Sequence, residues 1–370
     1  MTTARKEGLR SALLTGALAG VLTAQPAFAR QSTPEALWTA AEAAERDARR
    51  SSELNADPAL NAYVRDVACR VAPEYCVDLR VQVMDRPGFH AGMAPNGYLE
   101  VWSGLLLRVG SEAELAFVLG HEIGHVDANH PVEQRNALKT RLGAAMAVGA
   151  VASAAGAYYA VDLSAVGDMA RHGAVAASDD YSLAQEIEAD RIGFERLVKA
   201  GYDPGAAADL WRSRQDDGIA ADRVTALETL GAASPEGWRR ERDAWRAAIR
   251  PHLAGWLADD LRRRDFEGAL ALTARLERDG MDAGVLGFHR GEIYRLRREE
   301  GDAERARDAY LAASGYTDAP VAVWRELGDV QARLGRNAEA RAAWRTYLER
   351  APTAEDRWIV EDSLAALGGS

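Results

Sequence analysis

Cysteine and histidine are scarce in this chain, and positive charge is not in excess. Its 370 residues include two cysteines and seven histidines, and the formal net charge is −11. Two cysteines with no histidine nearby cannot complete a metal site of their own. The negative charge disfavours nucleic acid and anionic membrane surfaces as partners, because both carry negative charge themselves.

The N-terminus has the pattern of a secretory signal peptide. A basic start (Arg5, Lys6 and Arg10) precedes a short apolar run over residues 11–22, and Ala27-Phe28-Ala29 is a small-x-small cleavage signal. The sequence therefore predicts export to the periplasm with cleavage after Ala29. A retained membrane anchor is the weaker alternative, because the run is shorter than the roughly 20 residues that a span needs. Cleavage removes three basic residues and one acidic residue, which shifts the net charge from −11 to −13.

The two cysteines, Cys69 and Cys76, both follow the predicted cleavage point. In an oxidising compartment a pair this close predicts a disulfide, which would tie a helix at residues 60–71 to a strand at residues 77–84. A buried pair of free thiols is the alternative.

One motif points to a metal site. His121-Glu122-Ile123-Gly124-His125 is an H-E-x-x-H run, which on a helix places two imidazoles one turn apart on the same face. With seven histidines and 56 acidic residues in the chain, about 0.02 such matches are expected by chance. Two neutral imidazoles at this spacing can bind one Zn²⁺, and Glu122 can then deprotonate a bound water. The alternative is a helix whose histidines only pack or form hydrogen bonds.

A second acidic motif offers the third ligand that a catalytic zinc site requires. Glu186 and Asp190 lie four residues apart within residues 181–193, and so share one face of a predicted helix. Glu186 can supply an oxygen ligand, while Asp190 can accept a hydrogen bond from a ligand histidine. Read without the upstream motif, Glu186, Glu188 and Asp190 would be a solvated acidic face.

Together these motifs resemble the HtpX-like and BepA-like zinc metallopeptidases, a group that includes the CAAX prenyl proteases. The match rests on His121 to His125, on Glu186-Ile-Glu-Ala-Asp190, and on residues 94–106, which resemble the family's strand bordering the active-site cleft. It covers roughly residues 55 to 250. The resemblance implies one Zn²⁺ per chain held by His121, His125 and Glu186, with Glu122 as general base and Asp190 orienting a ligand. The chain departs from the family pattern at His90-Ala91-Gly92, before that strand.

The composition divides the chain into a signal peptide (1–29), a metallopeptidase domain (30–250) and a helical repeat domain (251–370). In the middle part we expect a mostly α (α+β) zincin-like fold with a small sheet. Periodicity predicts helices near 34–50, 56–72, 111–130, 181–201 and 205–215, and strands near 77–84 and 97–103. Residues 142–161 have no charged side chain but consist mainly of alanine and glycine, which favours a buried or cleft-covering helix. A membrane-touching role for this segment stays open.

The C-terminal part carries the spacing of a tetratricopeptide repeat. Its motif is formed by Trp324, Leu327, Gly328, Ala340, Trp344, Tyr347 and Pro352. Ala306, Tyr310 and Ala313 precede three of these positions by one 34-residue period, and a weaker unit spans residues 254–280. Such repeats stack and leave a concave surface for extended partners. A plain helical hairpin with incidental aromatic packing is the alternative.

From the sequence we therefore expect an exported zinc metalloendopeptidase that is soluble or peripherally attached to the membrane. By resemblance, its substrates are misfolded or misassembled envelope proteins, and its repeats recruit substrate or envelope assembly proteins. The alternatives are a chaperone-like assembly factor with a latent or gated peptidase site, and a scaffold. His90, His130 or an arginine within 239–250 could donate to the oxyanion.

Overall fold

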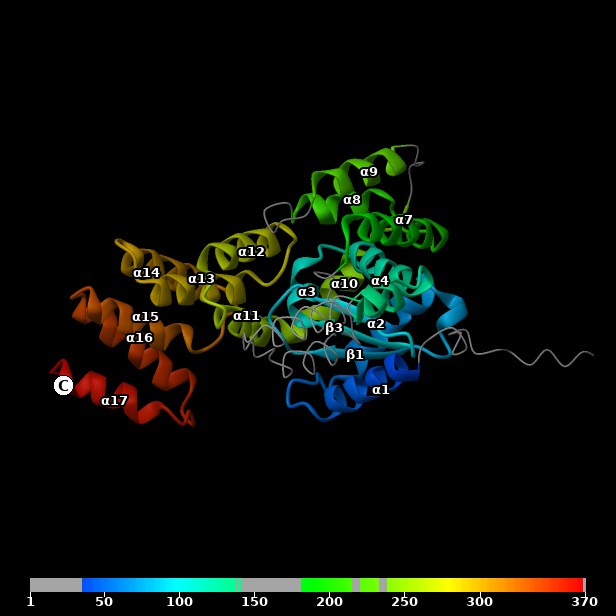
Figure 1. Cartoon of the computed structure of the whole chain (residues 1–370). Coiled ribbons are helices and arrows are strands. Elements are labelled where there is room, and N and C mark those ends of the chain that lie inside the picture. The colour runs from blue at the N-terminus through cyan, green and yellow to red at the C-terminus, as the bar shows by residue number, and fades with distance from the viewer. Residues whose placement is uncertain (1–34, 138, 141–180, 215–219, 233–237, 369–370) are drawn as a thin grey trace, which may run out of the picture.

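Helices make up most of the described part of the molecule, as the sequence predicts, and the one sheet found there is small and lies in the N-terminal half (Figure 1). The computed structural model describes residues 35–137, 139–140, 181–214, 220–232 and 238–368. The sheet-bearing half contains α1 (Glu35–Arg50), α2 (Pro58–Val71), β1 (Arg80–Met84), β2 (Ala91–Met93), β3 (Tyr98–Trp102), α3 (Ser103–Arg108), α4 (Glu112–Asp127), α7 (Leu183–Lys199), α8 (Gly205–Arg212), α9 (Ala221–Gly231) and α10 (Arg242–Ile249). The rest comprises α11 (Leu253–Leu261), α12 (Phe266–Arg278), α13 (Ala283–Arg297), α14 (Asp302–Ala313), α15 (Val323–Arg333), α16 (Asn337–Arg350) and α17 (Arg357–Ala366).

The sheet has the strand order β1-β3-β2, so the last strand in the chain lies in the centre. β3 pairs in parallel with β1 and antiparallel with β2. Side chains alternate between the two faces, as the pleat requires. Val83, Leu99 and Val101 belong to the main hydrophobic core, whereas Met84 and Tyr98 pack against α1 on the other face. β1 and β3 were predicted; β2 was not.

Helix α4 lies at the centre of the main core. Every residue from Glu112 to His125 is buried, so this helix has no solvent-facing stripe. Its start is fixed by Ser111, whose side chain accepts a hydrogen bond from the backbone N–H of Glu114. The motif histidines thus lie on a helix that packing and a cap hold in place.

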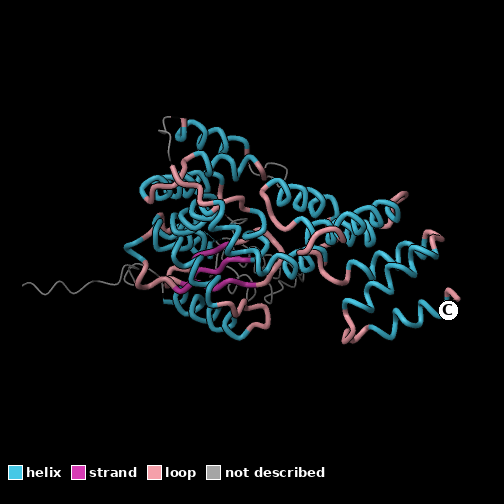
Figure 2. The backbone as a smooth tube through the Cα atoms, turned by 180° about the vertical axis from the view of Figure 1, so that it is seen from behind, coloured by secondary structure: helices cyan, strands magenta, loops and turns pink. Residues whose placement is uncertain are grey.

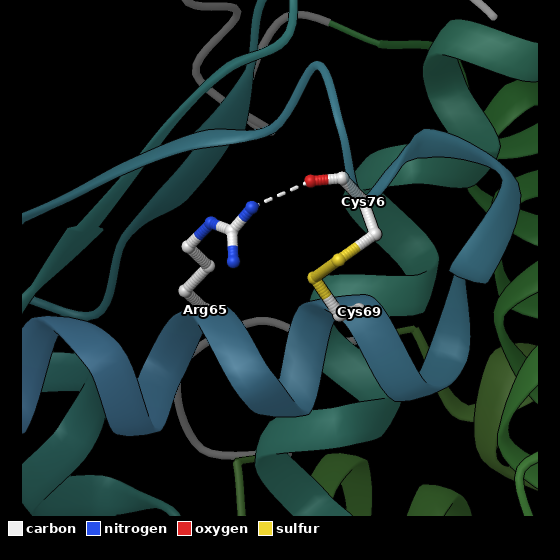
Figure 3. Close-up of a disulfide and its surroundings, with 3 residues drawn as sticks. All are labelled: Arg65, Cys69 and Cys76. Atoms are coloured by element: carbon white, nitrogen blue, oxygen red, sulfur yellow. Dashed lines mark hydrogen bonds between the residues drawn. A yellow bond between two sulfur atoms is a disulfide. The ribbon is translucent and has the colours of Figure 1, made fainter.

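A disulfide joins Cys69 on α2 to Cys76 in the turn before β1 (Figure 3). Arg65, one turn earlier on α2, donates a hydrogen bond of 2.7 Å to the backbone carbonyl of Cys76 (Figure 3). The bridged residues are seven apart in sequence, and closing a loop this short stabilises a protein by about 2 kcal/mol. The end of α2 is therefore tied to the turn that leads into the sheet.

The main core continues past residue 250 into the next two helices. Trp256 and Leu257 of α11, and Leu272 and Leu276 of α12, belong to the same cluster as the sheet and α4. Arg108 of α3 also forms an ion pair of 2.8 Å with the buried Asp260 of α11. The division between residues 250 and 251 stays a prediction, and α11 and α12 pack as part of the sheet-bearing half.

The helices from α13 onward form hairpins that extend away from the sheet (Figures 1 and 2). α13 packs with α14, and α15 packs with α16, which is consistent with a helical repeat. In each pair a glycine on the first helix lies against an aromatic ring on the second. A Cβ added at Gly291 would come within 2.3 Å of the Tyr310 ring, and one at Gly328 within 2.3 Å of the Trp344 ring. Glycine is required at both positions because any side chain would push the paired helices apart.

Two predictions concern residues outside the described ranges. The signal peptide over 1–29 and the apolar segment 142–161 both lie there. Across the part of the chain that the structure describes, no helix is both long and apolar enough to cross a membrane.

Candidate metal centre

Three side chains predicted as ligands meet between α4 and α7. The Nε2 atoms of His121 and His125 are 3.1 Å apart. Glu186 Oε2 lies 3.5 Å from His121 Nε2, and Glu186 Oε1 lies 3.6 Å from His125 Nε2. All three side chains are buried. Folding thus brings together two imidazoles and a carboxylate that is 61 residues further along the chain than His125.

These separations fit a zinc ion. Zinc binds nitrogen and oxygen at about 2.0–2.1 Å in a tetrahedron, whose corners are then about 3.3 Å apart. The separations between the ligand atoms in the structure are 3.1, 3.5 and 3.6 Å, which lie on either side of that value. Both carboxylate oxygens of Glu186 are also buried without a hydrogen-bond partner, as expected of atoms whose partner is a cation. The residues present therefore fit the metal that the sequence predicts.

The approach of the two helices depends on glycines. A Cβ added at Gly193 of α7 would lie 2.8 Å from the backbone nitrogen of His121, a distance that real Cβ atoms do not show. On α4, a Cβ at Gly124 would lie 3.1 Å from the carbonyl oxygen of Ala189. Contact between the backbones is what places Glu186 within reach of the histidines.

Gly193→Ala is expected to move α7 away from α4 and to weaken both folding and metal binding. Overpacking of this kind destabilises a protein by about 1–3 kcal/mol. Chemical denaturation and zinc titration of the variant would measure the two effects. Gly255→Ala is the control, because an added Cβ at Gly255 on α11 meets nothing within 4 Å. Unchanged stability and zinc affinity in Gly193→Ala would show that the helix contact is not required.

Asp190, which the sequence predicts to orient a ligand histidine, lies beside His121. Its Oδ1 lies 3.0 Å from His121 Nδ1, which leaves Nε2 of the same ring for the metal. Burial alone would lower the pKa of His121, but Asp190 and the nearby carboxylates raise it. Trp211 of α8 donates a hydrogen bond of 2.9 Å to Asp190 Oδ1 and helps to hold the carboxylate in place.

His130 contacts the ring of His125 in a comparable way, and this contact was not predicted from the sequence. Its Nδ1 lies 2.9 Å from Nδ1 of His130, and His130 Nε2 lies 3.4 Å from Glu188 Oε2. The ring of Tyr181 stacks on His125 with centroids 4.0 Å apart. In the tautomer with the proton on Nδ1, His125 donates to His130 and leaves its Nε2 unprotonated. Burial, together with the neighbouring His121 and His130, holds the pKa of His125 well below its usual range, so that it stays neutral as a ligand must.

Glu122 is buried beside the cluster on α4, with 5% of its surface exposed. Burial and the negative charge of Glu186 raise its pKa to about 8, while His121 and Arg223 oppose the shift. A carboxyl group whose pKa lies near neutrality can both accept and return a proton.

Two of the candidates that the sequence offered as oxyanion donors have other contacts. His90 packs against the ring of Trp102, with centroids 4.5 Å apart. Within residues 239–250, Arg240 pairs with Asp203 and Asp209. Arg223 of α9 was not predicted as a site residue, and it contacts both Glu186 and Asp190. No local motif marks this arginine, because it is 33 residues beyond Asp190 and on another helix.

Comparison with known proteins agrees with this geometry. The model of peptidase family M48 matches residues 58–254, which is more than half of the chain, and the chain belongs to that family. The family prediction is thereby confirmed. The match includes the whole of α4 and α7, and with them the His121, His125 and Glu186 cluster.

Individual relatives match over shorter stretches. The chain is 33% identical over 137 residues to the mitochondrial metalloendopeptidase OMA1 of Arabidopsis thaliana, covering 36% of this chain and 25% of the relative. It is 29% identical over 171 residues to the beta-barrel assembly-enhancing protease of Escherichia coli, covering 44% and 34%. It is 35% identical over 106 residues to the metalloprotease YcaL of Escherichia coli, covering 29% and 39%. The chain thus spans between a quarter and two fifths of these relatives' own lengths.

Proposed function

We propose that this protein is a zinc-dependent metalloendopeptidase acting on protein substrates. The observation that carries the proposal is the buried cluster of His121, His125 and Glu186, whose ligand atoms all lie within 4.8 Å of one another. Membership of peptidase family M48 supports the same reaction. Zinc is the metal that suits two imidazoles and one carboxylate with a fourth position left for water.

Each side chain around the cluster has a role in this proposal. Bound there, zinc would supply a Lewis acid that acidifies water and polarises the peptide carbonyl. Glu122 takes the proton from the attacking water and returns it to the leaving amine. Asp190 and His130 keep the ligand rings in the tautomers that present Nε2.

The proposed substrates are misfolded or misassembled proteins of the cell envelope, and the proposed compartment is the periplasm. The signal-like N-terminus and the similarity to a beta-barrel assembly-enhancing protease support this assignment. The proposed repeat domain would recruit substrate or an assembly partner. It carries exposed large apolar side chains of the kind that mark protein-binding surfaces: Leu311, Tyr316, Val321, Trp358 and Ile359.

Casein cleavage by the full mature chain tests the reaction. We expect cleavage that a chelator removes and that added zinc restores. Cleavage that resists the chelator would contradict a metal-dependent mechanism. If the zinc-loaded chain binds unfolded proteins but cleaves none of them, the chaperone-like alternative with a latent site would be favoured.

A further inference from the structure

One buried arginine connects both carboxylates of the candidate metal centre. Arg223 lies on α9, and 7% of its surface is exposed. Its Nε donates to Asp190 Oδ2 at 2.7 Å and its Nη2 donates to Asp190 Oδ1 at 2.9 Å. The remaining nitrogen, Nη1, lies 2.8 Å from Glu186 Oε2. The guanidinium therefore spans the proposed ligand and the aspartate that orients His121.

From this geometry we propose that Arg223 is a positioning residue for the metal site. It fixes the Glu186 carboxylate in the orientation that faces the histidines, and it holds Asp190 against His121. The inference rests on the proposed zinc site and deepens it. No family motif of the sequence includes this residue, which reaches the site from outside the two metal-bearing helices.

The two oxygens of the Glu186 carboxylate have different contacts. Oε2 is paired with the Arg223 guanidinium and lies 3.5 Å from His121 Nε2, whereas Oε1 lies 3.6 Å from His125 Nε2. A carboxylate that could rotate freely would offer either oxygen, or both. Pairing one oxygen with a fixed cation stops this rotation and keeps the carboxylate turned toward both histidines, as the outer partners of metal ligands do.

The charges in this region require such a cation. Glu186, Asp190 and Glu122 are all buried around the same point, and buried carboxylates are strongly destabilising unless they are paired. Arginine suits the task better than lysine, because its planar fork can bind two carboxylates at once and stays charged.

Arg223 is itself held in place. Its guanidinium carbon lies 4.7 Å from the centre of the Trp211 ring, and Trp211 donates its own hydrogen bond to Asp190. α8 supplies the tryptophan and α9 supplies the arginine, and Figure 1 shows the two helices together beside α7. The helical hairpin α8–α9 thus adds a rigid support to ligands that it does not itself provide.

Zinc affinity of Arg223→Gln tests the proposal, measured on the full mature chain by competition with a chromophoric chelator. Loss of a residue that supports a ligand weakens metal binding by about 10–100-fold, and we expect a decrease in this range. Arg223→Lys keeps the charge but not the fork, so its affinity should lie between those of Arg223→Gln and the wild type. The matched control is Arg212→Gln in the same hairpin, where the arginine pairs with Asp209 and Glu228 at the surface. Affinity equal to wild type in Arg223→Gln would overturn the proposal.

A double-mutant cycle separates positioning from general destabilisation. Because Arg223 contacts both Glu186 and Asp190, Arg223→Gln in a Glu186→Gln/Asp190→Asn background should change zinc affinity by less than about twofold. If the combined variant instead loses zinc affinity by the full product of the separate losses, the arginine acts independently of these carboxylates, and the proposal fails. Circular dichroism melting identifies any variant that does not fold. If Arg223→Gln does not fold, the zinc affinity of Arg223→Lys tests the proposal instead.

The outcome is distinguishable from that of the proposed function. A wild-type chain that binds zinc but cleaves no protein would refute the peptidase while leaving the affinity series valid. An active wild type with unchanged affinity in Arg223→Gln would refute the positioning role alone.

Discussion

Glu122→Gln is expected to abolish peptide hydrolysis while zinc remains bound. The amide of glutamine has nearly the same shape as the carboxylate but cannot accept a proton from the attacking water. General acid–base catalysis contributes about 10²–10⁴-fold to a rate, so we expect kcat to fall by about 10³-fold or more. Glu122 is not among the three clustered ligands, and so the metal should stay.

Two measurements on the same preparation check this result: casein cleavage and zinc content per chain. Glu114→Gln is the matched control, because Glu114 is a buried glutamate on the same helix whose carboxylate accepts a hydrogen bond from the backbone N–H of Gly110. We expect that control to keep its activity. Full activity in Glu122→Gln would rule out its role as general base.

The protonation state of Glu122 depends on whether a metal is bound, and the Glu122→Gln variant can in addition be used to capture substrates. In the metal-free chain burial raises this pKa to about 8, whereas a bound divalent cation favours the ionised carboxylate. The inactive Glu122→Gln chain should still hold its substrates, so proteins that remain bound to it in cells would identify them.

His125→Ala is expected to lose the metal altogether. The substitution leaves one imidazole and one carboxylate, and a catalytic zinc site needs three protein ligands. Zinc content should therefore fall from about one ion per chain to about zero at micromolar free zinc, and hydrolysis should disappear with it.

Elemental analysis after gel filtration measures this loss. The control is His252→Ala, which removes an imidazole that stacks on Trp256 and pairs with Asp57 well outside the motif. That variant should keep its zinc. A His125→Ala chain that still contains one tightly bound zinc would show that the ion is held elsewhere.

The sequence predicted those parts of the structure whose signal lies within a few neighbouring residues. H-E-x-x-H is defined by one helical turn, and β1 and β3 have visible alternation. β2 has only three residues with glycine in the middle, so no periodicity marks it. Its pairing with β3 is a tertiary effect.

The supporting residues of the site were harder to find for the same reason. His130 lies five residues after His125, and only the turn that follows α4 brings its ring back to the ligand. The position of Arg223 depends on the packing of α9 against α7 and α8, which no local pattern encodes. Ligands that form motifs can be found from sequence, whereas the residues that hold them follow from the fold.

The shared core of the sheet and α11–α12 has a practical consequence for dissecting the protein. Cutting the chain after residue 250 would strip Trp256, Leu257, Leu272 and Leu276 from an interior that includes α4. Each large apolar side chain removed from such an interior weakens folding by about 2–5 kcal/mol, and a whole domain is stable by only about 5–15 kcal/mol. Leu286 on α13 is the last residue of this core, so a recombinant fragment meant to preserve the metal-bearing half must end beyond it.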